Sequence, residues 1–501
     1  MSDHSSGSNA DSRELAQFGY EQSFERHTGK FASFAVAFAF VSIATGLFTT
    51  YGSVLNSSGP VGIWTWPIAT LGSVAVALVL GMLASRIPVT GYAYQWTSRL
   101  ANPVLGWIIG WVSFSFLAIV VVAVDYTIAG TVLPVLLNYE GTTLNAALIT
   151  GVVVLCQAAL VSQSTRWTER VNNAAVSAEL IGMVTLTALL FIVAAIRGQA
   201  DGDNLFSKGA LPDADFWSFG DWNTAGPWML GFLLGSFTIV GFESAANLAE
   251  QTNDPERVVP RAMWQAVLAS GVLGFLFLLA VTLAAGDPVA LAQSGTPVAD
   301  VIEKVLGSVV STLLLIMVVL AIFACGMVIM LTGTRLTWAM ARDERFPGWK
   351  VLNKVSPRTH TPFNATVFYT VLALAILAVF TSVSSNALFT LFSAASLLPA
   401  IIYASTVVLF IVKRKSLPAS DKFNLGRWEI PVVVVAVVWL VFELSLFRDS
   451  SFKETWLYVL AMMVVGGIYL VALLATRGRA ALAMPEMTSI DAEFDREANV
   501  S

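Results

Sequence analysis

Charged residues are scarce in this sequence. Asp, Glu, Lys and Arg make up 12% of the 501 residues, whereas a soluble protein carries about 25%. Cysteine occurs only twice, both times inside apolar runs, so that no disulfide framework or metal-ligand spacing is visible. All three histidines lie outside the apolar runs, which argues against a metal site built on histidine. We therefore expect neither a metal nor another cofactor.

Sequence features of enzymes and pumps are also missing. The apolar runs contain no nucleophile–base pair and no set of metal ligands, which argues against a membrane enzyme. A phosphate-binding glycine loop and a nucleotide-binding domain are absent, which argues against a primary pump. The net charge of −5 gives no sign of a nucleic-acid partner.

The two ends of the chain are polar and acidic. Residues 1–30 lack the basic segment and apolar core of a signal peptide, and we expect them to form a cytoplasmic tail. Within this tail the stretch ELAQFGYEQSFER, residues 14–26, is a candidate for a short amphipathic helix on the membrane. Residues 477–501 form a second predicted cytoplasmic tail.

Long apolar runs dominate the chain between the tails. Hydrophobic residues make up 56% of the sequence, and the mean hydropathy is +0.73. A membrane-spanning helix needs about 20 apolar residues, so we expect an all-α integral membrane protein with about twelve such helices. The predicted spans are 32–56, 62–84, 104–137, 143–163, 173–196, 225–250, 263–286, 308–341, 363–382, 387–412, 429–447 and 455–476.

Lysine and arginine alternate strongly between the predicted loops. With the N-terminus in the cytoplasm, 16 basic residues fall in cytoplasmic loops and 5 in outer loops. Because basic residues favour the cytoplasmic side, we expect a multi-pass protein of the cell membrane, plasma or inner, with both termini cytoplasmic. The sixteen are Arg86, Arg99, Arg166, Arg170, Arg257, Arg261, Arg342, Arg345, Lys350, Lys354, Arg358, Lys413, Arg414, Lys415, Lys422 and Arg427.

Polar residues interrupt the sixth predicted span. The segment Gly235–Thr252 contains Gly241, Glu243, Asn247 and Glu250. An unpaired carboxylate in hydrocarbon costs about 2.5–3.5 kcal/mol on insertion scales. Glycine beside a charge favours a helix that opens and turns its backbone toward a polar cavity. The alternative is a structural glycine with a glutamate that reaches the membrane surface.

The first span carries a matching interruption, five spans earlier. In the stretch Phe40–Pro60, Thr45 and Gly46 lie near mid-span and are followed by further polar residues and glycines. Paired interruptions in corresponding halves indicate the binding site of an inverted-repeat transporter. A lone Thr-Gly pair would be more typical of a packing notch between helices, and the pairing favours the site.

Several motifs resemble those of the amino acid–polyamine–organocation superfamily of permeases. SIATGLF (Ser42–Phe48) is similar to the substrate loop of its first helix, and ASRIPVTGYAYQW (Ala84–Trp96) to the loop after its second. VGFESA and EQTNDPERVVPRA, within Val240–Ala262, resemble the end of helix six and the following loop. TRLTWAMARDERFP (Thr334–Pro347) resembles the end of helix eight. The pattern TGLFTTYGSVLNSSGP resembles the corresponding stretch in the branch of the superfamily that carries GABA, choline and other amino compounds.

The resemblance implies a LeuT-type fold, a 5+5 inverted repeat in which helices 1 and 6 are broken. The implied ten-helix core covers residues 31–412, with repeats at 31–196 and 225–412, and residues 413–476 hold two accessory helices. One position departs from the pattern. Met82 stands near the end of the second span, where relatives often have an acidic residue.

The break in the first span predicts a carboxylate site. Unwinding there would free backbone N–H groups around Ala44, Thr45, Gly46 and Leu47. These groups would lie at the positive end of a half-helix, which suits an anion.

The break in the sixth span predicts an ammonium site. Unwinding there would free carbonyl groups around Phe237, Val240 and Gly241, and Phe242 completes the predicted substrate-binding set. The two breaks together predict an α-amino acid or a longer ω-amino acid as substrate. The resemblance further implies that Phe237 is an aromatic gate over the substrate, whereas without it Phe237 would be a core aromatic.

Two glutamates are candidates for coupling or gating. Glu243 follows the sixth-span break and is predicted to contact a substrate amine or to act as a proton-sensitive latch, the alternative being a structural carboxylate. The middle of span eight, Ile322–Met330, has no adjacent Ser/Thr pair, which weakens a sodium site. Glu179 stands where several proton-linked relatives have a lysine. Because desolvation disfavours a charged carboxyl group, we expect Glu179 to bind and release a proton; recruitment of a metal cation or a structural pairing are the alternatives.

These observations predict a secondary active transporter that moves an amino acid or a related small amino compound such as GABA by alternating access. Proton coupling and exchange are both compatible with the sequence. Within transport, the alternative is a choline or polyamine carrier, which would not need the carboxylate half of the site. From a different class, the alternative is a solute sensor that binds without transporting. The oligomeric state cannot be derived from the sequence.

Overall fold

The computed structural model describes residues 15–16, 18–21, 23–24, 26–139, 142–383, 387–417, 420–478 and 482, and among these it leaves the side chains of 383 and 387–389 aside. Most of the two predicted tails, 1–30 and 477–501, lies outside the described residues. The described part is helical, and the β pairing recorded in it is an isolated bridge between Thr28 and Thr252.

The first five predicted spans and the segments that link and follow them form eight helices and three short turns. Apolar sequence favours helices here because only a helix satisfies its backbone hydrogen bonds within a single segment in lipid. In chain order they are α2 (Lys30–Val41), α3 (Ile43–Ser57), α4 (Thr65–Ala84), α5 (Tyr92–Leu100), α6 (Pro103–Thr127), α7 (Leu133–Leu137), α8 (Thr143–Gln163) and α9 (Thr165–Ile196), with the short turns η1 (Pro60–Trp64), η2 (Ile128–Val132) and η3 (Asp203–Phe206) between them.

The remainder of the chain starts with three short helices and continues with long ones. These are α10 (Pro227–Gly231), α11 (Leu233–Thr238), α12 (Ser244–Asn247), η4 (Ala249–Gln251), α13 (Pro255–Leu283), α14 (Pro288–Ala292), α15 (Pro297–Leu306), α16 (Ser308–Arg342), α17 (Trp349–Leu352), α18 (Phe363–Val383), α19 (Ala387–Lys413), α20 (Glu429–Leu446) and α21 (Lys453–Arg477), with η5 (Gly426–Trp428) and η6 (Ser450–Phe452) before the last two.

Eleven described helices are long and apolar enough to cross a membrane. They match eleven of the predicted spans, and the twelfth, 225–250, is divided among α10, α11, α12 and η4. The prediction of an all-α membrane protein with about twelve spanning helices and broken helices 1 and 6 is confirmed. The fifth and seventh spans begin at Thr165 and Pro255, before the predicted starts at 173 and 263, because both helices continue past the apolar window through turns that contain arginine.

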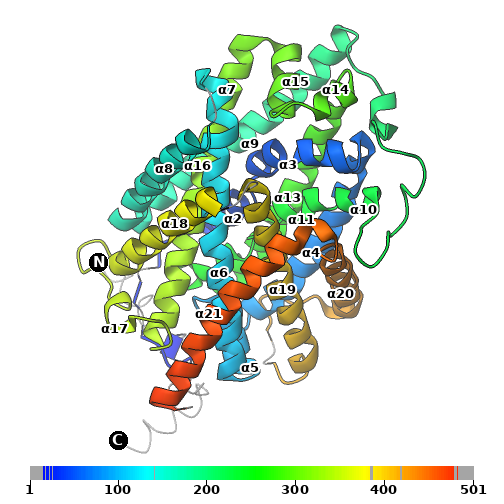
Figure 1. Ribbon diagram of the computed structural model, residues 1–501. Helices are drawn as coiled ribbons and strands as arrows, with labels where there is room; N and C mark the ends of the chain where they lie inside the picture. Colours follow the sequence, from blue (N-terminus) through cyan, green and yellow to red (C-terminus); the bar gives the residue numbers. More distant parts are fainter. Residues whose placement is uncertain are drawn as a thin grey trace, which may run out of the picture.

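The connections between helices gather at two ends of the bundle (Figure 1). The links α4–α5, α8–α9, η4–α13, α16–α18 and α19–α20 meet at one end, as shown by the pairs Ser85–Ser420, Thr361–Ser162 and Arg342–Glu250. The sixteen basic residues noted above lie in these links, in α5 or in the adjoining turns of the neighbouring helices, and we call this the basic end. At the opposite end, α3 contacts α14 through Asn56 and Ala292.

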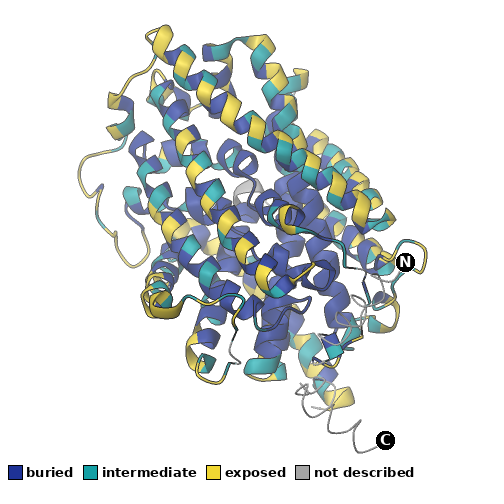
Figure 2. Ribbon diagram, turned by 180° about the vertical axis from the view of Figure 1, so that it is seen from behind, coloured by how far each residue is buried: buried dark blue, intermediate teal, exposed yellow. Residues whose placement is uncertain are grey.

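The broken helices lie at the centre of the bundle. Figure 2 shows buried segments in the middle and exposed stripes on the outer helices. Every residue from Leu234 to Thr252 is buried, as is every residue from Val36 to Phe48. The lipid-facing side chains belong to surrounding helices such as α8, α9 and α21, which expose Leu148, Ile181 and Val464.

The N-terminal segment differs from its prediction as an amphipathic helix on the membrane. Leu15, Phe18, Tyr20 and Phe24 are all buried within the protein at the basic end, and among the described residues of 14–26 only 15–16 are helical. The apolar side chains that were expected to face lipid therefore pack against the protein itself.

A glycine sets the contact between α4 and α20. A methyl group added at Gly72 of α4 would lie 2.3 Å from the indole ring of Trp439. We predict that Gly72→Ala loses about 1–3 kcal/mol of stability, because overpacking forces the two helices apart. Thermal unfolding of purified protein measures the loss.

The control is Gly467→Ala in α21, where nothing lies within 4 Å of an added methyl group. In a Trp439→Ala background the cost of Gly72→Ala should shrink, since contacting residues couple in a double-mutant cycle. Equal unfolding temperatures for Gly72→Ala and Gly467→Ala would contradict the close packing.

Candidate functional site

The first span breaks at a single residue. Helix α2 ends at Val41, Ser42 has φ 33° and ψ 93°, and α3 begins at Ile43. Ala44, Thr45, Gly46 and Leu47 were predicted to be unwound, and they instead form the first turns of α3. The prediction placed the break too far along the chain. The Thr-Gly pair marks a close contact between helices, whereas the backbone turns at Ser42, before that pair.

The backbone N–H groups at the start of α3 face partners inside the protein. Ala44 N–H donates to Glu179 Oε1 at 3.3 Å, Thr45 N–H to Ser42 Oγ at 3.3 Å, and Gly46 N–H to the carbonyl of Ser42 at 3.1 Å. Ser42 Oγ also donates to Glu179 Oε1 at 3.3 Å. The positive end of α3 therefore faces the side-chain carboxylate of Glu179, and the predicted binding of a substrate carboxylate there stays a prediction.

The sixth span opens between Ile239 and Glu243. Gly241 has φ +81°, a conformation that favours glycine, and a methyl group on it would lie 1.8 Å from the ring of Phe40. Its N–H donates to Tyr403 Oη at 2.9 Å, and its carbonyl accepts from Ser244 N–H at 2.9 Å. The predicted break is present, but the carbonyl of Gly241 already has a partner within the chain.

Glu243 is tied to α19. Tyr403 Oη donates to Glu243 Oε2 at 2.6 Å, and the ring of Phe242 stacks on Tyr403 with centroids 5.1 Å apart. One tyrosine thus contacts three consecutive residues of the break. Sequence reasoning missed Tyr403, although a single hydroxyl-bearing aromatic residue within the apolar run LLPAIIYASTVVLF was a signal for it.

A small cavity of about 10 Å³ lies where the two breaks meet. Of the predicted substrate-binding residues, Thr45, Gly46, Phe237 and Val240 line it, whereas Ala44, Leu47, Gly241 and Phe242 do not. The lining that sequence reasoning missed comes from α2, α6, α11 and α16, and consists of Phe40, Val41, Val120, Val124, Thr238, Cys325 and Ile329.

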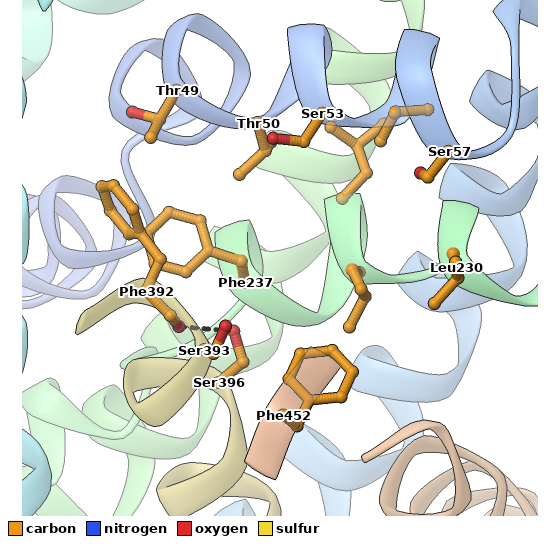
Figure 3. A pocket seen from close by; sticks show the side chains of 13 residues that line it. Thr49, Thr50, Ser53, Ser57, Leu230, Phe237, Phe392, Ser393, Ser396 and Phe452 are labelled. Atoms are coloured by element: carbon orange, nitrogen blue, oxygen red, sulfur yellow. Dashed lines mark hydrogen bonds between the residues drawn. The ribbon is translucent and has the colours of Figure 1, made fainter. Parts of the chain in front are cut away.

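A larger cavity of about 220 Å³ lies toward the opposite end. Figure 3 shows hydroxyl groups of α3 along one side and those of α19 on the other, with the rings of Phe237 and Phe392 together at one edge. Phe237 lines both cavities, and its ring meets Phe392 edge-on with centroids 4.4 Å apart. Phe237 therefore lies between the two cavities, and Phe392 contacts it from the side of the larger one.

Among the residues that the structure describes, no charged side chain lines either cavity. Two hydroxyl groups that line the larger cavity are used within α3, since Thr49 Oγ1 donates to the carbonyl of Thr45 at 2.6 Å and Thr50 Oγ1 to that of Gly46 at 2.7 Å. Within the described residues, no three side chains of His, Cys, Asp or Glu gather closely enough to hold a metal ion. Backbone dipoles, hydroxyl groups and the nearby Glu179 supply the polarity here.

Two broken helices that meet at a buried polar centre are the arrangement of a membrane transporter, and the sequence comparisons agree with it. The amino acid permease family matches residues 31–469. The chain belongs to the amino acid permease family.

Relatives of the permease align with most of the chain, but their sequence identity to it is low. It is 26% identical to the amino-acid permease BAT1 of Arabidopsis thaliana over 85% of this chain and 86% of that protein. It is 25% identical to the BAT1 homolog of Oryza sativa, over 92% of each chain. It is also 25% identical to the GABA-specific permease of Saccharomyces cerevisiae, over 92% of this chain and 83% of that one.

The family and the fold together establish the class of activity. The permease is a multi-pass membrane protein that transports amino acids, and it is a transporter rather than an enzyme. Its substrate is a small molecule, and its surroundings are the lipid bilayer.

The contact between α3 and α11 yields a prediction about Gly46. A methyl group at Gly46 would lie 2.1 Å from Thr238 Oγ1, so Gly46→Ala must push the two broken helices apart. Overpacking of this kind costs about 1–3 kcal/mol, and we expect amino acid binding to weaken about tenfold or more while the protein still inserts and purifies. Ligand-induced thermal stabilisation measures the change in affinity.

The matched control is Gly151→Ala in α8, whose added methyl group would meet Leu374 at an ordinary 3.7 Å. Adding Thr238→Gly to Gly46→Ala removes the obstructing side chain and should restore part of the affinity. Parental affinity in Gly46→Ala would remove the start of α3 from the site.

A second prediction concerns the hydroxyl group of Tyr403. Tyr403→Phe keeps the ring that stacks on Phe242 but leaves Glu243 Oε2 and Gly241 N–H without this partner. A buried polar group that loses its partner costs about 1–3 kcal/mol, so we expect a lower unfolding temperature and slower uptake. The equally buried Tyr369→Phe is the control, since its hydroxyl group lies away from the break on α18. If both variants transport like the parent, the Tyr403 hydroxyl group does not hold the break.

Proposed function

We propose that the permease is a secondary active transporter that moves an amino acid, or a related small amino compound such as GABA, by alternating access with proton coupling. In this proposal residues 31–412 form the ten-helix core, with repeats 31–196 and 225–412, and residues 413–476 are accessory. The basic end faces the cytoplasm, as do both termini, and the protein resides in the plasma or inner membrane.

The observation that carries the proposal is the carboxylate of Glu179 at the start of α3. Its Oε1 atom accepts from Ala44 N–H and from Ser42 Oγ, and its side chain is only 1% exposed. A substrate carboxylate would be attracted to the same positive helix end. Two carboxylates about 6 Å apart repel by about 3 kcal/mol at an effective dielectric constant of about 20.

A proton on Glu179 removes this repulsion. The neutral acid accepts weakly from the start of α3, which leaves the helix end free to attract the substrate carboxylate. Proton and substrate binding then support each other, and linkage makes this coupling reciprocal. The substrate and the proton are then released to the same side of the membrane, which leaves Glu179 ionised and again bonded to Ala44 N–H.

The sixth-span break supplies the other half of the proposed site. Carbonyl groups of Phe237 and Val240 beside the small cavity suit an ammonium group, and Phe237 with Phe392 acts as the gate toward the larger cavity. Glu243 acts as a latch, because Tyr403 joins it to α19. When the break moves, Tyr403 must either move with it or give up this hydrogen bond. The small cavity expands around the substrate as the rings separate.

The substrate class can be tested by competition. A choline or polyamine carrier would have no use for the anion-attracting end of α3. Uptake that is blocked by zwitterionic amino acids and GABA but not by choline or putrescine supports the proposal. The name of the yeast relative makes GABA the first compound to include.

A sensor that binds without transporting is the alternative from another class. Counterflow in liposomes separates the two, because only a transporter exchanges labelled internal for unlabelled external amino acid. Absence of counterflow with intact ligand binding would favour the sensor.

The coupling role of Glu179 yields the next prediction. We expect the parent in proteoliposomes to accumulate amino acid when a pH gradient is imposed, without sodium, and Glu179→Gln to lose this accumulation. Because glutamine resembles the protonated acid, the variant should still bind and exchange substrate, and its affinity should no longer depend on pH.

The matched control is Glu443→Gln, which replaces another buried carboxyl group, on the accessory helix α20. It should retain accumulation driven by the pH gradient. Accumulation that requires sodium, or that persists unchanged in Glu179→Gln, would rule out proton coupling through this residue.

A further inference from the structure

The N-terminal segment is packed into the basic end of the permease. Its described residues between 15 and 28, which we call the strap, include Leu15, Phe18, Tyr20 and Phe24, whose side chains are 1–7% exposed. A tail without a role in the fold would leave such side chains in water or lipid. The strap therefore occupies a defined position against the ends of the helices.

Tyr20 completes a stack of charged and aromatic groups. Its hydroxyl group donates to Asp343 Oδ1 at 2.8 Å, and its ring lies 3.7 Å from the guanidinium carbon of Arg342. Arg342 in turn pairs with Glu250 beside η4, with Nη1 and Oε2 3.1 Å apart. Burial raises the pKa of the Tyr20 hydroxyl group above its ordinary value and the charge of Asp343 raises it further, so this group stays protonated and donates.

Phe24 makes a second contact with α16, one to two turns deeper. Its ring meets Trp338 edge-on with centroids 4.6 Å apart, and the guanidinium carbon of Arg335 lies 4.3 Å from the ring. Arg335 is fully buried and donates to Thr165 at the start of α9. Phe24 thus fills the space between α16 and the α8–α9 connection.

The end of the strap is joined to the broken sixth span. The backbone N–H groups of His27 and Thr28 both donate to the carbonyl of Gln251, at 3.0 and 2.9 Å, and Asn253 N–H donates to the carbonyl of Thr28 at 3.0 Å. His27 Nε2 lies 3.1 Å from Glu169 Oε2 on α9. The strap therefore links η4 to α9 and α16.

The strap lies on the route from the small cavity between the two breaks to the basic end. Cys325 of α16 lines the small cavity where the two breaks meet. Further along α16, Val328 and Leu331 line a second cavity of about 10 Å³ together with Thr28. A third cavity, of about 210 Å³, lies at the basic end and is lined by Phe24 and His27. Strap residues thus form part of the wall of two successive cavities.

The distance along the helix shows how much of the route the strap covers. From Cys325 to Arg342, α16 rises by about 25 Å at about 1.5 Å per residue. The strap contacts Arg335, Trp338 and Arg342, which occupy the last part of this rise. For a substrate to leave at the basic end, η4 must separate from α16, and these contacts must break.

We propose that the strap is a removable plug: it holds the basic end closed in the present state and withdraws each time that end opens. The proposal rests on alternating access as the mode of transport. A segment bound only to the closed state shifts the population toward it, so weakening the strap favours the state that is open at the basic end.

The native thiol of Cys325 reports this opening. In a Cys156→Ser background, which removes the exposed thiol of α8, a membrane-impermeant maleimide is added from the basic end in inside-out vesicles. We expect slow labelling of the parent and labelling that is about fivefold faster in Tyr20→Phe, which loses one hydrogen bond to Asp343. Phe24→Ala should label at least as fast as Tyr20→Phe.

The matched control is Phe31→Ala, which truncates an aromatic residue just beyond the strap that is 48% exposed. It should label at the parental rate. Equal labelling rates in the parent, Tyr20→Phe and Phe24→Ala, with all three eluting as folded protein, would overturn the plug. Because Tyr20→Phe removes a single oxygen atom, it tests the proposal even if Phe24→Ala fails to fold.

The labelling experiment needs no substrate, so it separates the plug from the proposed transport function. Fast labelling of the strap variants, together with an absence of amino acid accumulation in any protein, would leave the plug intact and reject proton-coupled transport. Normal accumulation of amino acid together with unchanged labelling of the strap variants would support proton-coupled transport and reject the plug.

Discussion

The start of α3 and the carboxylate of Glu179 each satisfy the other in the buried centre of the bundle. A helix that begins inside a bundle leaves N–H groups without intrahelical partners, and an ionised glutamate inside a bundle has no solvent to stabilise it. The contact between Ala44 N–H and Glu179 Oε1 addresses both problems at once. The turn at Ser42, the packing of α3 against α11 and the position of α9 all have to be compatible with it. In the transport cycle proposed above, loss of the negative charge of Glu179 changes what the start of α3 can attract.

The spans could be predicted from the sequence because hydrophobic length is a local property. Eleven runs recur as helices, and the errors at the starts of α9 and α13 arise because helical hydrogen bonding continues where apolar sequence stops. The broken sixth span was also predictable, since Gly241 and Glu243 are poor residues for a continuous helix in lipid. The exact turn at Ser42 was not, because nothing local distinguishes this serine from the Thr-Gly pair that follows it.

The site could be predicted only in part for a related reason. Glu179 was identified because proton-linked relatives have a lysine at its position and because it lies inside an apolar run. Its contact with Ala44 could not be foreseen, since it depends on how α9 packs against α3. Tyr403 is about 160 residues from its partner Glu243. Its hydroxyl group in an apolar run signals a buried partner, but the sequence does not indicate which residue that partner is. The burial of Phe18, Tyr20 and Phe24 was also hidden, since the same amphipathic pattern suits lipid and protein surfaces alike.

The division of the sixth span into short pieces bears on how the chain is made. None of α10, α11 and α12 is long enough to cross a bilayer, and the opening between them is held by Tyr403, which belongs to the tenth predicted span. During synthesis this region enters the membrane before its partner exists. It therefore has to wait, either as a continuous helix or sheltered by an assembly factor, until α19 has been inserted. The sixth-span break can therefore take its observed form only after α19 is present, and truncation before Tyr403 should disturb a break that lies about 160 residues upstream.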